Sequence, residues 1–366
     1  MSSSVSQPEI RVYVGNWSAD QTGGIYLHLL NPSTGELTFV SKTPEAGSPF
    51  HLTLDHTCSH LYAANTIDSF EDQPGGTVCA FSVNQSNGEL TFINQQSAHG
   101  NLPCYVSLDK QGKHVLVGSY SSGTLAILPI LADGSVGPAT DHVQHVGSGF
   151  TDRQTAPYVH CIVPDPAGRF AFAADLGIDK VMIYRLDAQP GKLIPNDPPY
   201  VSLQPGAGPR HLIFHHNGRF VYLINEIDST ITVYAYIASA GALTPLQTIP
   251  TLPSDYTDKN HTADLQIHPN GRFLYGTNRA HNSIVMYDLD PNTGLLTLRE
   301  RVSSEGEWPW SIAIDPTANF LLSANSQSNR VVVFRIDPAT GQLTFTGHGA
   351  EVPGAVCVKT VLHKGG

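Results

Sequence analysis

The chain has 366 residues, of which 14% are charged and 40% hydrophobic, and it carries a formal net charge of −11. This composition is typical of a folded globular protein and excludes a disordered or fibrous chain. The sequence contains no block of lysines and arginines, so we expect no binding to nucleic acid or to an anionic membrane.

Residues 1–9 are polar and rich in serine, and they lack the charged start and apolar core of a secretion signal. We therefore expect a flexible N-terminal tail and a cytoplasmic protein, since no apolar run approaches the length of a membrane span. Residues 10–366 show no linker or shift in composition, which predicts one domain. The five cysteines have no paired short spacing and are expected to be buried thiols. The sequence does not indicate an oligomeric state.

A repeated unit organises the chain from residue 10 onward. The clearest copies are DPAGRFAFAAD at 165–175, HHNGRFVYLIN at 215–225 and HPNGRFLYGTN at 268–278. Four weaker copies end at residues 16, 65, 119 and 325, so the spacing between successive ends is 47 to 56 residues. Seven copies of this length are typical of a closed, repetitive architecture.

Each unit predicts four antiparallel strands, A to D. A short apolar strand A ends at the Pro- and Gly-containing turn, and the Arg-Phe stretch that follows begins strand B. Strand C follows, as at 283–289, and a turn such as DPNTG at 290–294 leads into strand D. Seven four-stranded units with almost no helical periodicity predict an all-β, seven-bladed β-propeller.

The two ends of the chain predict how the ring closes. The first unit lacks strand A, because Arg11 to Asn16 already matches strand B. The missing strand reappears as AVCVKTVL at 355–362, and we expect it to become the innermost strand of the first blade. This pairing would hide an otherwise exposed strand edge.

The loop-rich face of the propeller is the expected functional face. In an antiparallel blade, the loops from D to A and from B to C lie on the same side. Those loops contain the long insertions at 66–75, 141–158 and 250–262, whereas the turns on the other side are short and repetitive. Long irregular loops on a regular scaffold are where binding sites usually lie.

The repeat separates structural residues from functional ones, because a residue that builds a blade should recur. Arg169, Arg219 and Arg272 recur, and we interpret them as turn and strand packing. The start of strand A, from blade 2 to the closing strand, does not recur and reads Phe50, Cys104, His160, Arg210, Ala263, Trp310, Gly354. The position after strand B also varies and reads Trp17, Thr66, Tyr120, Leu176, Glu226, Arg279, Ser326.

Four of these non-recurring residues have side chains that can bind an anion or transfer a proton, and all lie in blades four to six: His160, Arg210, Glu226 and Arg279. Two arginines suit an anionic substrate, while histidine and glutamate supply a base and an acid. Three other interpretations stay open: Glu226 and Arg279 form an ordinary ion pair, His160 is a core histidine, or Arg210 faces solvent. Candidates for further substrate contacts are His211, Tyr120, Ser119, Asn16, His51 and Trp310.

We expect no metal and no cofactor. The HVQH segment at 142–145 has a spacing that some metals accept, but it lies in a loop without a partner carboxylate pattern, and chance explains it better. The glycine spacing of GSYSSG at 118–123 does not match that of a hydrolase nucleophile turn.

The sequence resembles the seven-bladed propeller lactonase family, which includes propeller-type 6-phosphogluconolactonases and the 3-carboxy-cis,cis-muconate lactonizing enzyme. The most specific segments are GAGPRHLIFHHNGRFVYLINE at 206–226, ADLQIHPNGRFLYGTNR at 263–279 and LVGSYSSGTL at 116–125. The site proposed for that family is a His, two Arg and a Glu, which correspond to His160, Arg210, Arg279 and Glu226.

The resemblance implies hydrolysis of the ring ester of a small anionic lactone, most similar to the reaction of a 6-phosphogluconolactonase. Arg210 and Arg279 would then bind the anionic group and the developing oxyanion, and Glu226 or His160 would activate water. Two alternatives remain at this stage. One is a cycloisomerase that uses the same residues, and the other is a non-catalytic propeller that binds a protein partner.

Overall fold

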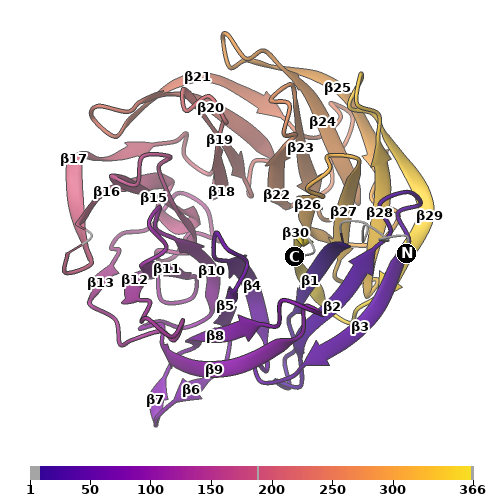
Figure 1. Ribbon diagram of the computed structural model, residues 1–366. Helices are drawn as coiled ribbons and strands as arrows, with labels where there is room; N and C mark the ends of the chain where they lie inside the picture. The colour runs from indigo at the N-terminus through magenta and orange to yellow at the C-terminus, as the bar shows by residue number, and fades with distance from the viewer. Residues whose placement is uncertain (1–8, 188, 364–366) are drawn as a thin grey trace, which may run out of the picture.

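The computed structural model describes residues 9–187 and 189–363. The expected N-terminal tail lies outside the described residues, apart from Glu9, which begins the first strand. Seven four-stranded antiparallel sheets surround a central axis, as Figure 1 shows, and the sequence prediction of a seven-bladed propeller is confirmed.

Within each blade the strands run from the innermost to the outermost in the order A, B, C, D. Blade 1 consists of β30 (Ala355–His363), β1 (Glu9–Asn16), β2 (Gly24–Leu30) and β3 (Leu37–Thr43). Blade 2 consists of β4 (Pro49–Leu54), β5 (His60–Asn65), β8 (Thr77–Val83) and β9 (Leu90–Ser97). Blade 3 consists of β10 (Pro103–Leu108), β11 (His114–Ser119), β12 (Thr124–Pro129) and β13 (Asp141–Gln144).

The remaining blades follow in chain order. Blade 4 consists of β14 (Val159–Pro164), β15 (Phe170–Asp175), β16 (Lys180–Asp187) and β17 (Lys192–Ser202). Blade 5 consists of β18 (Pro209–Phe214), β19 (Phe220–Asn225), β20 (Thr230–Ile237) and β21 (Ala242–Pro250). Blade 6 consists of β22 (Thr262–Ile267), β23 (Phe273–Asn278), β24 (Ser283–Leu289) and β25 (Leu296–Ser303). Blade 7 consists of β26 (Pro309–Ile314), β27 (Phe320–Asn325), β28 (Arg330–Ile336) and β29 (Leu343–Glu351).

The ring closes as the sequence predicts. Strand β30 pairs antiparallel with β1, so that Ile10 lies opposite Leu362 and Val14 lies opposite Val358. The two ends of the chain therefore share one blade, and β1 has no free inner edge.

The hydrophobic core is divided among the interfaces between blades. Seven clusters of buried side chains each join two neighbouring blades; one of them packs Phe172 and Val181 of blade 4 against Leu212 and Val221 of blade 5. Burying one such side chain contributes about 1.5–3 kcal/mol. The stability of the disc therefore depends on every interface around the ring.

The turn from strand A to strand B has the same backbone hydrogen bond in six blades, from an N–H to the carbonyl three residues earlier, and an aspartate or histidine side chain adds further bonds. In blade 4 the Asp165 carboxylate accepts hydrogen bonds from the backbone N–H groups of Arg169 and Phe170, at 2.6 and 2.8 Å. Gly168 has a φ of 71°, and the corresponding Gly218 and Gly271 have φ of 67° and 71°. Glycine adopts this left-handed conformation without a steric penalty, which explains why it recurs.

The recurring arginines pack as the sequence predicts. The guanidinium groups of Arg169, Arg219 and Arg272 lie over the ring of the phenylalanine that follows each of them, 5.1–5.6 Å from its centroid. They therefore belong to the scaffold and not to a site.

The insertions differ from the sequence prediction in two details. Residues 141–144 form β13, the outer strand of blade 3, because they pair with β12, so the insertion before blade 4 begins only at residue 145. Residues 69–74 contain a small hairpin, β6 (Ser69–Phe70) and β7 (Gln73–Pro74). The helical structure described is one turn, η1 (Leu176–Ile178), and no described helix has the length and apolar character to cross a membrane.

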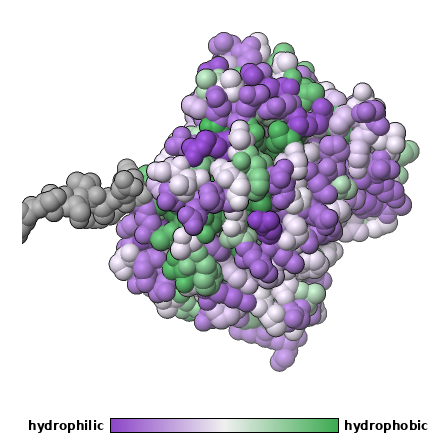
Figure 2. Space-filling view, turned by 90° about the vertical axis from the view of Figure 1, so that its right-hand side faces the viewer, coloured by the Kyte–Doolittle hydropathy of each residue, from purple (hydrophilic) through white to green (hydrophobic). Residues whose placement is uncertain are grey.

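The outer rim carries both hydrophilic and apolar side chains. Figure 2 shows the side of the disc that lies to the right in Figure 1, where apolar groups form patches within a mostly hydrophilic surface. Exposed apolar side chains on the outer strands include Phe39, Leu298 and Phe345. Of the five cysteines, all free thiols, four are buried and Cys58 is half-buried.

Candidate active site

A β-bulge at the start of strand A builds the mouth of the central channel. In the pairing of strands A and B, the register shifts between Val159 and Cys161 in blade 4 and between Pro209 and His211 in blade 5. The extra residues are His160 and Arg210. A bulge turns its extra side chain away from the regular alternation of a strand, which is how these two residues come to face the channel.

The same bulge recurs in the other blades. The extra residues there are Phe50, Cys104 and Trp310 in blades 2, 3 and 7, and one of the pair 263–264 in blade 6. In blade 1 the extra residue is Val356 and not Gly354, which corrects the sequence prediction. The prediction misplaced it because the closing strand lacks the turn that marks the register of the other units.

Glu226 is the centre of the polar cluster at this mouth. It follows β19 directly, and its side chain is 4% exposed. Its Oε2 accepts from Arg210 Nε at 2.9 Å and from Arg279 Nη2 at 2.6 Å, and His160 Nε2 lies 3.4 Å away. The structure therefore brings together the four residues that the sequence singled out.

Arg153 completes the cluster and was missed by the sequence analysis. Its Nη2 donates to Glu226 Oε1 at 2.6 Å, and its Nη1 lies 3.0 Å from His261 Nδ1. Its side chain is 35% exposed, against 1% for Arg210 and 6% for Arg279. The available signal was an arginine in the insertion before blade 4 that has no counterpart in other blades.

The cluster carries a local excess of positive charge. Burial alone would raise the pKa of Glu226, but the charge of Arg279, the contact with His160 and the charge of Arg210 outweigh it and hold that pKa well below its usual value. Burial and repulsion by Arg210 lower the pKa of His160 to about 3. Burial lowers the pKa of Arg279 to about 10, so it stays charged at neutral pH. Three guanidinium groups then face one carboxylate and a neutral imidazole, which leaves two positive charges in a protein of net charge −11.

A cavity of about 210 Å³ opens above this cluster. Its polar lining is formed by Arg153, His160, Glu226 and Arg279, and its aromatic lining by Trp17, Phe50, Tyr120 and Trp310. The guanidinium of Arg279 lies 4.6 Å from the centroid of the Trp310 ring system, and the Tyr120 ring lies 4.6 Å from that of His160. Tyr120 and Trp310 thus lie where a ligand in this cavity would contact them.

Arg210 lies beneath the cavity and does not line it. Its Nη1 donates to the carbonyl of Ala263 and lies 3.4 Å from His211 Nε2, while its Nε holds Glu226. This placement makes Arg210 a support for the carboxylate, whereas Arg279 reaches the cavity itself.

Four predicted substrate contacts do not line this cavity. The side chain of Asn16 is buried, and its Oδ1 accepts from the Gly24 N–H at 2.6 Å, an internal bond that leaves it unavailable. Ser119 is buried, with an Oγ that has no partner among the described residues. His51 and His211 each follow the bulge residue by one position, so they point deeper into the channel and line a different cavity.

The HVQH segment forms no metal site. His145 Nδ1 lies 2.6 Å from Asp175 Oδ2 and its Nε2 lies 2.8 Å from the Tyr184 hydroxyl, all in the interior. His142 instead stacks on His99, with ring centroids 5.2 Å apart. Within the described part of the chain, no group of three His, Cys, Asp or Glu side chains is arranged to hold a metal ion.

The model of the family described as "Lactonase, 7-bladed beta-propeller" matches residues 11–360. The chain belongs to this lactonase family. It is 33% identical over 297 residues to the 6-phosphogluconolactonase of Bacillus subtilis, and the match covers 81% of this chain and 82% of that protein. It is 31% identical over 316 residues to the 6-phosphogluconolactonase of Formosa agariphila, covering 83% of this chain and 86% of that protein.

The solved structures agree with this assignment. The periplasmic gluconolactonase PpgL of Pseudomonas aeruginosa superposes with a TM-score of 0.90 at 32% identity, covering 96% of this chain and 99% of that one. The similarity therefore extends over nearly the whole chain.

Proposed function

We propose that this lactonase hydrolyses the ring ester of a phosphorylated sugar lactone, with 6-phosphogluconolactone as the substrate that fits best. The observation that carries the proposal is the positive cluster of Arg153, Arg210 and Arg279 around one carboxylate, in a protein that is otherwise acidic. A guanidinium binds a phosphate through two parallel hydrogen bonds. The names of the Bacillus and Formosa relatives support the same substrate.

Arg153 is suited to binding the phosphate, and Arg279 is suited to binding the reacting ester. Arg153 is the most exposed of the three, so the anionic end of a substrate meets it first. Arg279 Nη1 has no protein partner among the described residues, and Arg279 lines the cavity. A donor in this enclosed position stabilises the negative charge that develops on the carbonyl oxygen.

The reaction needs one base and one acid. Water adds to the carbonyl carbon and loses a proton, the bond from that carbon to the ring oxygen breaks, and the ring oxygen takes up a proton to give the hydroxy acid. His160 is the better candidate for the base, because it lines the cavity as a neutral imidazole, whereas Arg153, Arg210 and Arg279 already occupy both oxygens of Glu226. Glu226 then stabilises the imidazolium that forms, and His160 returns the proton to the ring oxygen.

A panel of lactones tests the proposal through proton release at constant pH. It contains 6-phosphogluconolactone, gluconolactone and carboxymuconolactone, with spontaneous hydrolysis subtracted. We expect the phosphorylated lactone to have the highest kcat/KM. If only carboxymuconolactone reacts, and its ring opens without uptake of water, the enzyme is a cycloisomerase and not a hydrolase. If no lactone in the panel reacts, the result favours a propeller that binds a protein partner.

Two variants separate phosphate recognition from chemistry. Arg153→Gln should lower kcat/KM for the phosphorylated lactone about tenfold and leave that for gluconolactone nearly unchanged, because one charge-assisted contact contributes about 1.5 kcal/mol or more. His160→Gln should reduce kcat for both lactones equally. Equal losses in Arg153→Gln for both lactones would contradict the assignment of Arg153 to the phosphate.

The cytoplasmic location stays a prediction. The polar N-terminus suggested it, but one of the similar solved structures is named a periplasmic gluconolactonase. Fractionation of cells that express the untagged protein would decide between the two compartments.

A further inference from the structure

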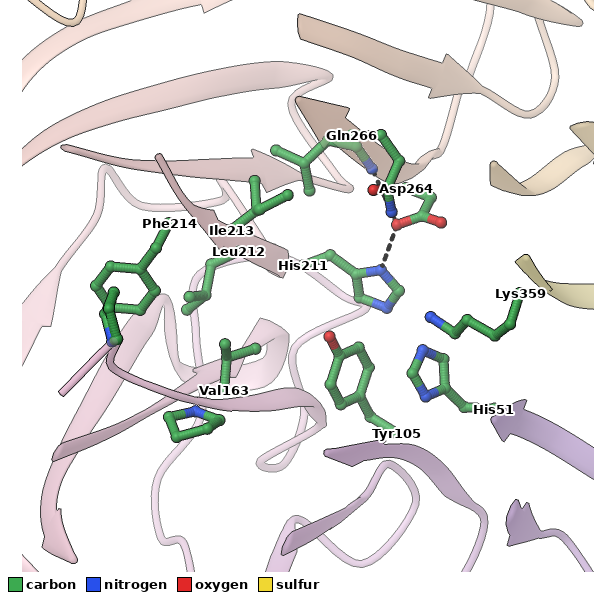
Figure 3. Close-up of a pocket in the computed structure, with 13 residues that line it drawn as sticks. His51, Tyr105, Val163, His211, Leu212, Ile213, Phe214, Asp264, Gln266 and Lys359 are labelled. Atoms are coloured by element: carbon green, nitrogen blue, oxygen red, sulfur yellow. Dashed lines mark hydrogen bonds and ion pairs between the residues drawn. The ribbon is translucent and has the colours of Figure 1, made fainter. Parts of the chain in front are cut away.

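A second cavity lies in the central channel, on the side away from the mouth. Its volume is about 230 Å³, and it shares no lining residue with the mouth cavity. Its walls include Pro164 and Phe214, at the ends of strands A that lead into the short turns. Figure 3 shows a polar group of side chains at one end and apolar side chains at the other.

The polar end is formed by residues that follow the bulges. His51 follows Phe50 and Tyr105 follows Cys104, so within each of these strands A one residue lines the mouth cavity and the next lines the second cavity. Lys359 of β30 lies beside His51, and its Nζ points into the same group of polar side chains (Figure 3). The rings of His51 and Tyr105 stack, with centroids 4.1 Å apart.

The carboxylate of this cavity already has a full set of donors. Asp264 Oδ1 accepts from His211 Nδ1 at 3.1 Å and from the Leu265 N–H at 3.0 Å. Its Oδ2 accepts from the hydroxyl of Ser311 and from the N–H of Ile312, at 3.0 and 3.1 Å. A carboxylate accepts about four hydrogen bonds, so Asp264 has no capacity left for a further donor.

The donors, by contrast, are free. Among the described residues, no hydrogen-bond or ion-pair partner reaches Lys359 Nζ or the Tyr105 hydroxyl. His51 Nδ1 accepts from the Val106 N–H at 3.3 Å, which places the ring proton on Nε2, and that nitrogen also has no protein partner. His51 is 9% exposed and points toward Lys359 and Tyr105 (Figure 3). The amide of Gln266 adds one donor and one acceptor to the lining.

We infer that this second cavity binds a small organic monocarboxylate. Its two oxygens accept from Lys359 Nζ, His51 Nε2 and the Tyr105 hydroxyl, and its apolar body packs against Val163, Leu212 and Phe214. Lys359 supplies one positive charge, and the Asp264 carboxylate in the same lining offsets it, so this cavity has no excess charge to hold a dianionic phosphate, whereas the mouth has two extra positive charges. This site does not depend on the proposed lactonase activity, because it shares no lining residue with the mouth cavity.

Binding of 4-fluorobenzoate, followed by fluorine NMR, tests this inference. We expect saturable binding at one site per chain, at least tenfold weaker in Lys359→Met and weaker in Tyr105→Phe, which loses only the hydroxyl. The matched control Lys192→Met removes an exposed lysine of β17 and should bind as the wild type does. Hydrolysis of the lactone, measured in parallel, should change less than twofold in Lys359→Met.

Four results would overturn the inference. The first is no saturable binding in the wild type, and the second is equal affinity in the wild type, Lys359→Met and Tyr105→Phe. The third is loss of binding in Arg279→Ala with full binding in Lys359→Met, which would assign the carboxylate to the mouth. Inorganic phosphate should compete poorly, and efficient competition by phosphate would contradict the choice of a monocarboxylate.

Discussion

The two ends of strand A follow opposite rules. At the turn end, six blades repeat one backbone arrangement, in which the carbonyl of residue 55, 109, 165, 215, 268 or 315 accepts a hydrogen bond from the N–H three residues later. At the mouth end, the backbone repeats the same bulge but the side chain changes from blade to blade. Stability therefore comes from what recurs, and the site comes from what varies on a recurring backbone.

The mouth has an apolar part and a polar part, which differ in the side chain at the bulge. Blades 2, 3 and 7 place Phe50, Cys104 and Trp310 on the bulge and form an apolar wall, whereas blades 4 and 5 place His160 and Arg210 there. The bulge is a position that tolerates different side chains because its residue is an extra one, outside the regular ladder.

The largest effect is expected when a whole strand A is removed. Deleting residues 355–366 leaves β1 with an unpaired inner edge and takes buried Val356, Cys357 and Val358 out of the core. We expect no soluble folded protein, as judged by yield, circular dichroism and thermal melting. A truncated chain that melts at the wild-type temperature would show that closure does not stabilise the ring.

A pair of arginines in blade 6 tests the contrast between varying and recurring residues. Arg279→Ala should lower kcat/KM about 10²–10³-fold, the usual loss when an oxyanion donor is removed. Arg272→Ala, which removes the recurring arginine at the turn end, should leave kcat/KM within about twofold. A loss in Arg279→Ala of less than threefold would remove this residue from the chemistry.

The turn end should respond in stability and not in activity. Asp165→Ala leaves the backbone N–H groups of Arg169 and Phe170, and the hydroxyl of Tyr236, without their acceptor. We expect a loss of about 3 kcal/mol in the free energy of unfolding, measured in urea, with kcat/KM unchanged at temperatures where the variant is folded. Asp165→Asn, which keeps one acceptor oxygen, should lose less. A fall in kcat/KM at full stability would contradict the separation of the two ends.

The histidines at the mouth and in the channel predict the response to acid. Burial lowers the pKa of both His160 and His211, to about 3 and about 4. In the unfolded chain these groups titrate near pH 6.5, so below that pH the unfolded state takes up protons that the folded state does not, and stability falls until the folded pKa values are reached. We expect the melting temperature to drop by several degrees between pH 7 and pH 5.

Activity should follow a different pH profile from stability. Since His160 is neutral down to its lowered pKa, kcat/KM should stay nearly constant from pH 7 to pH 5 while the protein is folded. An acid limb with a midpoint near pH 6.5 would show that the imidazole titrates as in free solution, and would contradict its burial against Arg210.

The smallest effect on the free energy of unfolding is expected at the turn of blade 7, where alanine replaces the usual glycine. Ala318 occupies the glycine position of blade 7 with a φ of 62°. Ala318→Gly should raise the free energy of unfolding by about 0.5–1 kcal/mol, because alanine pays a steric penalty in the left-handed region. Ala339→Gly, at a neighbouring turn residue without a positive φ, should give no gain. Equal effects of the two substitutions would rule out this explanation.

The sequence by itself determined the ring and much of its mouth. The repeat of turn, strand B and turn is local, so it fixed the number of blades, the closing strand and the face on which His160, Arg210, Glu226 and Arg279 lie. These four could be found because they break a pattern whose period is visible in one chain. In the closing strand, which has no such turn, the sequence pointed to Gly354, whereas the bulge residue is Val356.

Only the tertiary structure decided which of these side chains reach the mouth cavity and which support it. Arg153 reaches Glu226 from 73 residues away, through a loop whose path no repeat specifies. The bulge places Arg210 beneath the mouth cavity and sends His51 and His211 into a second one, although each of these histidines follows its bulge residue directly in the chain. Periodicity tells which side of a blade a residue lies on, but the depth of a side chain in the channel depends on how seven strands pack around one axis.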